Sequence, residues 1–417
     1  MSRRVVITGM GVVSPNGIGN AAFSSAVLEG RSGVRRITRF DPSEIQVQIA
    51  GEVPDFDELA WVEKRDRKHV SRVLPLALCA ASEALTDAGI DATSMSLEES
   101  RRFGVILGSG GGSQEFTEEQ YRLFFHQQYK QMSLFCVPTG VMGSLSSELN
   151  VRFGLRGSSH VITTGCTSST DAFGYSLRQI RAGRLDMVLS GGADAPIALG
   201  IIKGFILMKI LTDSWNDTPQ RGSRPFSADR DGFVLAEGAW MFVLEEYEHA
   251  RARGAKMLAE VCGYGSTCEA FHRVRLQECG EEPARAIGLA MQEARIAPTD
   301  VHYVNLHGTS TQLNDRIETR ALKLAFGEER ARNVPMSALK SQIGHPQGAC
   351  GAAGVAATIV AMRSGQLPPT INVEKPDPAC DLDYVPKAGR RKEIEHAVCN
   401  CIAFGSKNSA LVLRNCA

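Results

Sequence analysis

Short apolar runs that favour β-strands alternate along this chain with longer segments of helical periodicity, and the alternation occurs twice. Before residue 254 the strand-like runs are VVITG, FGVILGS, HVITTG, MVLSGGA and WMFVLEE; after it they are AEVCGYG, VHYVNLHG and VPMSAL. Segments 71–89 and 170–183 favour helices that end at a glycine, and a further helix is expected over about 346–364. This order predicts an α/β fold in which helices cover a largely parallel sheet.

Two segments from different parts of the chain share one pattern. Residues 160–183 and residues 334–365 each read as a strand, a turn with a reactive side chain, and a helix that ends at glycine. The repetition predicts a duplicated fold with an N-terminal half over 1–254 and a C-terminal half over 255–417. No low-complexity linker separates the halves, so we expect them to pack closely against each other.

Composition narrows the classes of function. The chain has 417 residues, 46 basic and 46 acidic, so the basic excess typical of nucleic-acid binders is absent. No run of about 18 uncharged apolar residues occurs, which predicts no membrane span. The N-terminus shows no signal-peptide pattern, and the 11 cysteines have no disulfide-framework spacing. These features predict a cytoplasmic protein with reduced thiols and with neither nucleic acid nor a membrane as a partner.

Several common cofactor motifs are missing. The glycine pairs at Gly9 and at Gly108 lack the third glycine of GxGxxG, and no P-loop, HExxH, CxxC or GxSxG occurs. The sequence therefore predicts no metal site and no dinucleotide site. The glycine cluster Gly108–Gly112 favours a tight turn over a phosphate cradle.

Cys166 follows a predicted strand and precedes a predicted helix. The positive end of a helix dipole and its free amide groups favour a thiolate, the reactive form of cysteine, and Gly165 permits a sharp turn there. A buried structural cysteine is the competing interpretation, because ten other cysteines occur in the chain.

His307 and His345 each lie at a turn after a predicted strand, and Lys340 lies shortly before His345. Each histidine alone favours a structural role. Together they favour a site, because turns at the carboxyl ends of parallel strands gather on one side of a sheet. A cysteine nucleophile with a neighbouring histidine is also the usual pair of residues in enzymes that transfer acyl groups between thioesters.

These motifs resemble those of the type II β-ketoacyl-acyl-carrier-protein synthases, members of the thiolase-fold superfamily. The resemblance covers essentially the whole chain and rests on VVITGMGVVSPNG, GCTSS, SRPFSADRDGFVLAEGA, HGTSTQLND, LKSQIGHPQGA and the C-terminal FGSKNSALVL. HGTST followed by a GH motif about 38 residues later is highly specific to this family.

The resemblance implies a five-layered αβαβα fold built from two duplicated halves, and a dimer whose interface lies near the cysteine strand. It implies that an acyl group passes from an acyl carrier protein to the enzyme. Decarboxylative Claisen condensation with malonyl-carrier protein then gives a 3-oxoacyl thioester. No metal or redox cofactor is implied, because the substrates are carried on the phosphopantetheine of the carrier protein.

The resemblance also assigns roles to individual residues. Cys166 would carry the acyl group, and His307 and His345 would hydrogen-bond the malonyl thioester oxygen. The backbone amides of Cys166 and Phe404 would form an oxyanion hole, with Phe404 as a gate, and Lys340 would fix the environment of His307. The further residues assigned by resemblance are Asp315 and Glu318 as supports of the site, and Lys64, Arg67, Lys68 and Lys209 as carrier-protein contacts.

The chain departs from the family pattern at two places. Gly354 stands where the family has a glutamate near the lysine, which removes the usual lysine partner. The family's C-terminal GFGGTN is AFGSKN at residues 403–408, which removes a glycine hinge. The aromatic-rich segment 114–136 would line the dimer interface and the end of the acyl tunnel, or be plain core.

Other functions remain as alternatives. A thiolase would use Cys401 as a second cysteine but lacks HGTST, and a non-catalytic chain-length-factor subunit would lack the nucleophile. The sequence favours slightly a polyketide or polyene synthase over primary fatty-acid elongation, which has the same chemistry. The partner would then be a second copy of the chain or a homologous chain-length-factor-like subunit.

Overall fold

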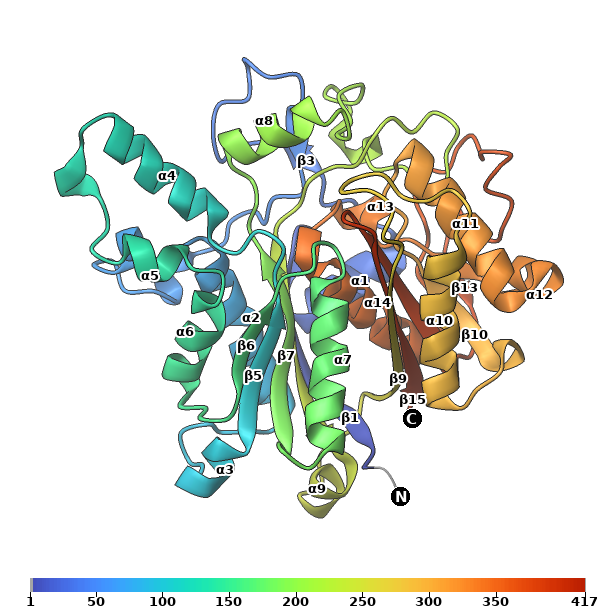
Figure 1. Cartoon of the computed structure of the whole chain (residues 1–417), viewed down its shortest axis with the longest axis horizontal. Helices are drawn as coiled ribbons and strands as arrows, with labels where there is room; N and C mark the ends of the chain where they lie inside the picture. Colours follow the sequence, from blue (N-terminus) through green and yellow to red (C-terminus); the bar gives the residue numbers. More distant parts are fainter. Residues whose placement is uncertain (1–2, 417) are drawn as a thin grey trace.

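One mixed β-sheet runs through the protein and consists of two halves with the same topology. The computed structural model describes residues 3–416 (Figure 1). Strand order is β6-β5-β7-β8-β1 in the N-terminal half and β11-β10-β14-β15-β9 in the C-terminal half. The strands of the first half are β1 (Val5–Ser14), β5 (Phe103–Gly108), β6 (Ser159–Ile162), β7 (Met187–Asp194) and β8 (Gly238–Glu246). Those of the second are β9 (Ala259–Cys268), β10 (Val301–Asn305), β11 (Met336–Ser337), β14 (His396–Ala403) and β15 (Lys407–Asn415).

Strand directions repeat as well as strand order. In each half the three outer strands are parallel and the two strands nearest the centre are antiparallel. The halves join where β1 pairs with β9 at Val6–Ile7. The predicted duplication is therefore confirmed. Residue 254, the predicted limit between the halves, lies in the connection between α9 (Tyr247–Ala252) and β9.

The prediction of a largely parallel sheet is wrong. Among the strands that the structure describes, the parallel pairs are β5 with β6 and β7, and β10 with β11 and β14. The strands nearest the centre pair antiparallel with their neighbours, and β14 and β15 form a hairpin. A short turn of this kind can join only antiparallel strands.

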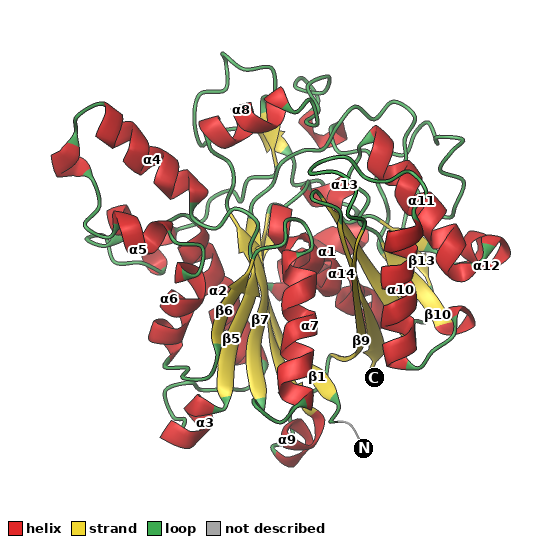
Figure 2. Ribbon diagram, in the orientation of Figure 1, coloured by secondary structure: helices red, strands yellow, loops and turns green. Residues whose placement is uncertain are grey.

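The helices lie in three layers around the two halves of the sheet (Figure 2). On the outer face of the N-terminal half are α2 (Val73–Asp87) and α6 (Ser144–Phe153); α10 (Glu281–Ala294) covers β9 and β15, with α11 (Gln312–Phe326) packed on it. Between the halves lie α7 (Ser168–Arg181) and α14 (Cys350–Ser364). This is the expected five-layered αβαβα arrangement.

Small residues bring the two central helices together. A Cβ atom added to Gly351 of α14 would lie 2.1 Å from Thr170 Oγ1 of α7. Ala352, Ala353 and Ala356 of α14 are buried in the hydrophobic core around α7. The helix α14 begins at Cys350, after one 3₁₀ turn, rather than at about 346.

The remaining elements are short and mostly peripheral. The helices are α1 (Asn20–Glu29), α3 (Leu97–Arg101), α4 (Gln114–Phe125), α5 (Cys136–Gly140), α8 (Leu199–Leu207), α12 (Glu328–Asn333) and α13 (Lys340–Ile343). The 3₁₀ turns are Glu58–Ala60, Arg67–His69, Tyr129–Gln131, Pro219–Arg221, Pro298–Asp300 and Gln347–Ala349, and the two-residue strands are β2 (Gly17–Ile18), β3 (Arg35–Arg36), β4 (Ile49–Ala50), β12 (Gln366–Leu367) and β13 (Arg390–Arg391). Within residues 3–416, no helix has the length and apolar character needed to cross a membrane.

The segment that contains α4 and α5 projects from the N-terminal half (Figure 1, left). Its predicted role as plain core is wrong for much of its surface, because many of its large apolar side chains are exposed to solvent. These are Tyr121, Phe124, Phe125, Tyr129, Leu134, Phe135, Val137 and Val141. Such a cluster on an outlying segment is typical of a protein–protein interface.

Candidate active site

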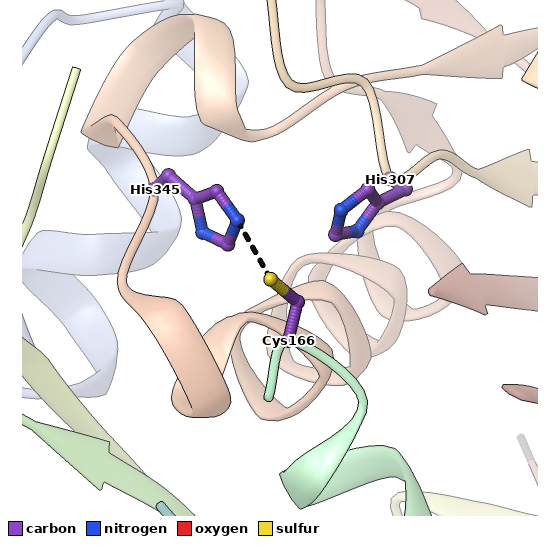
Figure 3. Close-up of side chains that lie close together, drawn as sticks. All are labelled: Cys166, His307 and His345. Atoms are coloured by element: carbon purple, nitrogen blue, oxygen red, sulfur yellow. Dashed lines mark hydrogen bonds between the residues drawn. The ribbon is translucent and has the colours of Figure 1, made fainter. Parts of the chain in front are cut away.

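Cys166 lies in the turn between β6 and α7, at the end of the helix where the sequence predicts it. Gly165 adopts a φ of +71°, a left-handed conformation that favours glycine. Ser168 Oγ accepts a hydrogen bond from the Thr164 amide at 2.9 Å and donates one to the Gly165 carbonyl at 2.6 Å. This turn directs the Cys166 side chain towards the C-terminal half of the molecule (Figure 3).

The C-terminal half brings both predicted histidines to Cys166. His345 Nε2 lies 3.2 Å from Cys166 Sγ. The two imidazole rings have centroids 5.5 Å apart and are nearly perpendicular, at 87°. One ligand atom from each of the three side chains lies within 4.8 Å of the others. Figure 3 shows both rings beyond the sulfur atom, on the side away from the Cys166 backbone.

Backbone hydrogen bonds fix His345 in place. Its amide donates to the Val234 carbonyl at 2.7 Å, and its carbonyl accepts from the Ala236 amide at 3.0 Å. The Gln347 amide donates to His345 Nδ1 at 3.2 Å. Because burial lowers the pKa of His345 well below its usual value, the ring is neutral and its single proton is on Nε2. His345 therefore donates to Cys166 Sγ.

The same reasoning gives the proton position on His307. Lys340 Nζ donates to His307 Nδ1 at 3.3 Å, so the ring proton is on Nε2. Burial, with the positive charge of Lys340 beside it, lowers the pKa of His307 well below its usual value. The site thus contains two neutral imidazoles, each with an Nε2–H donor.

Lys340 is buried and bound chiefly to His307. Its ammonium donates to the His307 carbonyl at 2.6 Å in addition to Nδ1. No ion pair involves Lys340 among the residues that the structure describes. A Cβ at Gly354, where the family has glutamate, would lie 2.6 Å from Asn305 Oδ1. The Asn305 side chain thus occupies space that a longer residue at 354 would need.

The expected thiolate at Cys166 is not supported. Burial raises the pKa of the Cys166 thiol to about 12, outweighing the lowering by Lys340 and by the hydrogen bond from the Phe404 amide. The resting site therefore holds a neutral thiol. The position at the helix end was predicted correctly, but the sequence contains no information on the burial that raises this pKa.

Phe404 lies in the turn between β14 and β15. The turn requires positive φ angles at Gly405 and Ser406, of 81° and 65°. The Phe404 backbone amide hydrogen-bonds the Cys166 thiol, and its half-buried side chain lines the cavity above the sulfur. The residue predicted as amide donor and gate is thus in contact with Cys166.

A cavity of about 310 Å³ leads from the surface to these side chains. Cys166, His307, His345 and Phe404 line its inner end. Thr309 and Thr311 line its wall, with their hydroxyl groups 3.0 Å apart. The other lining residues are Met208, Ile210, Phe233, His272, Val274, Arg275, Leu276, Leu313, Asn314, Ile402 and Ala403.

Glu318 and Asp315 hold the loop that carries His307. Glu318 accepts from the amides of His307 at 2.6 Å and Gly308 at 2.7 Å. Asp315 accepts from the Thr309 amide at 3.1 Å and lies 3.1 Å from Arg230 Nε. Both carboxylates are fully buried in helix α11, so neither reaches the cavity.

The four predicted carrier-protein contacts fall at two places. Lys209 is exposed beside Met208 and Ile210 at the cavity that contains Cys166. Arg67 and Lys68 line a different cavity, of about 740 Å³, and Arg67 pairs with Glu58. The exposed Lys64 lies three residues before Arg67. Their role in carrier binding stays a prediction.

Two supporting residues were not predicted from the sequence. Asn400 donates to Glu318 Oε1 at 2.8 Å. The buried Asp194, at the end of β7, accepts from the amides of Gly110 at 2.8 Å and Gly111 at 2.9 Å. The glycine cluster is therefore a turn whose amides bind a carboxylate of the protein. A carboxylate directly after the apolar run MVLSGGA was the available sequence signal for Asp194.

Comparisons with known proteins agree with this geometry. The sequence profile of the beta-ketoacyl synthase N-terminal domain matches residues 2–250, and that of the C-terminal domain matches residues 258–374. The chain is 42% identical over 420 residues to the putative polyketide beta-ketoacyl synthase 1 of Streptomyces halstedii, covering 99% of this chain and 98% of the relative. It is 39% identical over 418 residues to 3-oxoacyl-[acyl-carrier-protein] synthase 2 of Vibrio harveyi, covering 100% and 99%.

Solved structures give the same result. A type II polyketide-synthase ketosynthase in complex with its acyl-carrier protein superposes with a TM-score of 0.91 at 32% identity, covering all of both chains. The ishigamide ketosynthase/chain length factor gives the same TM-score, identity and coverage. From the profile matches, these relatives and the shared fold, the chain belongs to the beta-ketoacyl synthase family, whose members are acyltransferases that catalyse decarboxylative condensation.

Proposed function

We propose that this chain elongates an acyl thioester on a carrier protein in two stages, with Cys166 as the acyl-carrying nucleophile. The observation that carries the proposal is the position of Cys166 Sγ, 3.2 Å from His345 Nε2, with the His307 ring on the same side of the sulfur (Figure 3). A thiol and two imidazole N–H donors around one cavity suit acyl transfer followed by stabilisation of an enolate.

In the first stage, Cys166 Sγ attacks the carbonyl carbon of an acyl-phosphopantetheine thioester. The tetrahedral oxyanion binds at the backbone amides of Cys166 and Phe404. The bond to the phosphopantetheine sulfur then breaks, and that sulfur leaves with the proton that Cys166 gives up. The Phe404 amide, already directed at the Cys166 thiol, supports this assignment.

In the second stage, malonyl on a carrier protein enters the cavity. Its thioester oxygen accepts hydrogen bonds from His307 Nε2 and His345 Nε2, where negative charge develops as carbon dioxide leaves. Donors fixed in this way contribute typically about 3–4 kcal/mol each. The enolate carbon attacks the acyl-Cys166 carbonyl, and the Cys166 sulfur leaves as a thiolate that takes up a proton from solvent. A 3-oxoacyl thioester two carbons longer remains on the carrier.

We propose that no metal or redox cofactor takes part. Loss of carbon dioxide generates the carbon nucleophile. The negative charge of the resulting enolate is stabilised by hydrogen bonds from two neutral N–H donors. Lys340 is a positioning residue, because it binds the ring nitrogen of His307 that faces away from the cavity.

For the pathway, we propose a type II polyketide or polyene synthase. Among the relatives compared, those named as polyketide synthases are 39–42% identical to this chain, and those named as 3-oxoacyl-[acyl-carrier-protein] synthase 2 are 36–39% identical. Primary fatty-acid elongation has the same chemistry and is the second candidate. The solved relatives include one complex with an acyl-carrier protein and one with a chain length factor, which supports both kinds of partner.

An exposed sheet edge supports a dimer. Within residues 3–416, strand β6 pairs only with β5, and Ser159 and His160 on it are exposed. An unpaired edge strand binds readily to a second strand. We propose that β6, together with the projecting segment of α4 and α5, contacts a second copy of the chain or a homologous chain-length-factor-like subunit.

The function is tested with acyl-carrier and malonyl-carrier proteins from the same host. We expect release of carbon dioxide and a carrier-bound 3-oxoacyl product two carbons heavier than the acyl donor. The Cys166→Ala variant gives no product, and Cys79→Ala, which removes a thiol remote from the cavity, gives the normal yield. The mass of the trapped acyl group distinguishes polyketide from fatty-acid substrates. Product from Cys166→Ala would refute the proposal.

A further inference from the structure

Two thiols that the proposed mechanism does not use lie beneath the inner end of the cavity. Cys350 begins helix α14 and Cys401 lies in strand β14, and both are buried. Their sulfur atoms are 3.9 Å apart. Cys350 Sγ also donates to the Cys166 carbonyl at 3.1 Å, so the pair lies directly below the residue that carries the acyl group.

A third metal-binding group completes the cluster. One ring nitrogen of His307 lies within 4.8 Å of both sulfur atoms. The set of two sulfurs and one imidazole nitrogen suits soft ions such as Zn²⁺ and does not suit Mg²⁺ or Ca²⁺. Tetrahedral Zn²⁺ with Zn–S bonds of about 2.3 Å holds two sulfur ligands roughly 3.8 Å apart. Cys350 and Cys401 already stand at nearly this separation.

We propose that Cys350, Cys401 and His307 form a binding site for a soft divalent cation, Zn²⁺ being the best fit. Coordination converts the two thiols to thiolates, and their protons leave to solvent. The two negative charges then offset the charge of the ion beside the Lys340 ammonium. Lys340 keeps its hydrogen bond to the His307 carbonyl at 2.6 Å while the ring turns to the metal.

The location of the site predicts its effect. His307 lines the cavity, which gives an ion a route from the surface to the cluster. An ion that binds His307 turns the ring out of the position that Lys340 now holds at Nδ1, so the Nε2–H no longer points to the malonyl thioester. Zn²⁺ is therefore an inhibitor of decarboxylation. This effect rests on the proposed function, whereas binding of the ion does not.

A second group of ligands overlaps the first and must be distinguished from it. Cys166, His307 and His345 also lie within 4.8 Å of one another but offer a single sulfur. The Cys166→Ser variant removes that group and leaves the deeper one intact. We therefore choose Cys166→Ser as the background for the binding experiment.

The experiment titrates the full-length Cys166→Ser protein with Cd²⁺, whose bonds to thiolate absorb in the ultraviolet, and counts bound ions by mass spectrometry. We expect one tightly bound ion per chain and a thiolate band. Adding Cys350→Ala or Cys401→Ala removes both signals. Adding Cys399→Ser leaves them, because that buried thiol bonds to Thr358 at 3.3 Å outside the cluster.

Each result decides the proposal. The assignment would be overturned if the single Cys166→Ser variant bound no ion. It would also be overturned if the ion still bound after Cys350→Ala and after Cys401→Ala were added to that variant. Zn²⁺ is then titrated into decarboxylation assays of proteins that keep Cys166: the native chain, Cys350→Ala and Cys399→Ser. The rate of each protein is compared with its own rate without metal. We expect Cys350→Ala to raise the inhibitory concentration at least tenfold and Cys399→Ser to leave it unchanged. A protein that binds Cd²⁺ as expected but lacks synthase activity would refute the proposed function and not the metal site.

Discussion

Hydrogen bonds to the inner ring nitrogens determine what both histidines can do. The Gln347 amide occupies His345 Nδ1 and Lys340 Nζ occupies His307 Nδ1, which leaves both Nε2 protons facing the cavity. Neither ring can therefore accept the Cys166 proton at Nε2 without losing its own. The arrangement suits donors to an enolate oxygen better than general bases.

Replacing Lys340 with alanine tests this view of His307. Without the ammonium, His307 Nδ1 has no donor and the ring proton is free to move away from Nε2. We expect Lys340→Ala to slow decarboxylation of malonyl-carrier protein by roughly 10²-fold, the usual loss for one such donor. Acylation of Cys166 should change little, because Lys340 bonds to His307 and not to the oxyanion hole. An equal loss in both stages would contradict the positioning role.

The protonation state of Cys166 gives a second prediction. Since burial raises the pKa of its thiol to about 12, the thiolate fraction should increase with every step in pH up to at least pH 9. The folded protein is treated with iodoacetamide and then digested, and the alkylated peptide that contains Cys166 is quantified. The alkylation rate should rise about tenfold per pH unit from pH 7 to pH 9. A rate that levels off near pH 7 would indicate a thiolate already present in the resting enzyme.

At the scale of single elements, the close contact between α7 and α14 supports the turns that carry Cys166 and His345. Gly351 is the point of contact, since an added Cβ would lie 2.1 Å from Thr170 Oγ1 and 3.0 Å from the Thr170 amide. The two helices begin just after Cys166 and just after His345. Their separation therefore sets the distance between sulfur and imidazole.

We expect Gly351→Ala to destabilise the protein by roughly 1–3 kcal/mol through overpacking and to lower the thermal midpoint. Gly288→Ala is the matched control, because Gly288 is also helical and nothing lies within 4 Å of its added Cβ. That change should raise stability by up to about 1 kcal/mol, as alanine favours helices over glycine. Equal midpoints for the two variants would show that the contact is unimportant.

The elements also show where sequence reasoning succeeds and where it fails. Strand-end turns carry Cys166, His307 and His345 as predicted, because β-rich runs followed by glycine and a helical pattern have few other solutions. No strand was predicted over 396–415, where β14 and β15 lie. Asn400 interrupts the apolar run there, and the turn at 404–406 has no Asn-Gly or Asp-Gly signal.

Long-range contacts explain the remaining failures of prediction. The antiparallel centre of the sheet depends on β1 lying between β8 and β9, strands more than 220 residues away in the sequence. The pairing of Asp194 with the amides after β5 likewise depends on the sheet being formed. The local pattern of apolar and polar residues predicts neither the position of β1 nor the partners of Asp194. The resemblance to a known family supplied the five layers, and the individual residues alone did not.

At the scale of the whole molecule, ion pairs join the lower ends of strands far apart in the sequence. Asp186, just before β7, binds Arg3, before β1, at 2.7 Å and Arg102, before β5, at 2.7 Å. Hydrogen bonds from these two arginines, Arg102 first, lower the pKa of Asp186 to about 2. The carboxylate therefore stabilises the fold above its unfolded pKa, and this contribution is lost as pH falls towards 2.

We expect Asp186→Asn to lower the thermal midpoint at pH 7. The difference from the native protein should persist down to about pH 4 and narrow as pH falls further, because the native carboxylate then becomes protonated. The measurement is thermal unfolding of both proteins between pH 7 and pH 3. A gap that stays constant down to pH 3 would show that the ion pairs do not provide the stabilisation.

Covalent passage of the acyl group through the sulfur of Cys166 is the central step of the proposed function. The most direct test is peptide mass spectrometry of the protein after exposure to acyl-carrier protein, then again after one equivalent of malonyl-carrier protein. We expect an acyl group on the peptide that contains Cys166, and we expect it to disappear once malonyl-carrier protein is added. An acyl group on another residue, or one on Cys166 that malonyl does not remove, would contradict the proposed function.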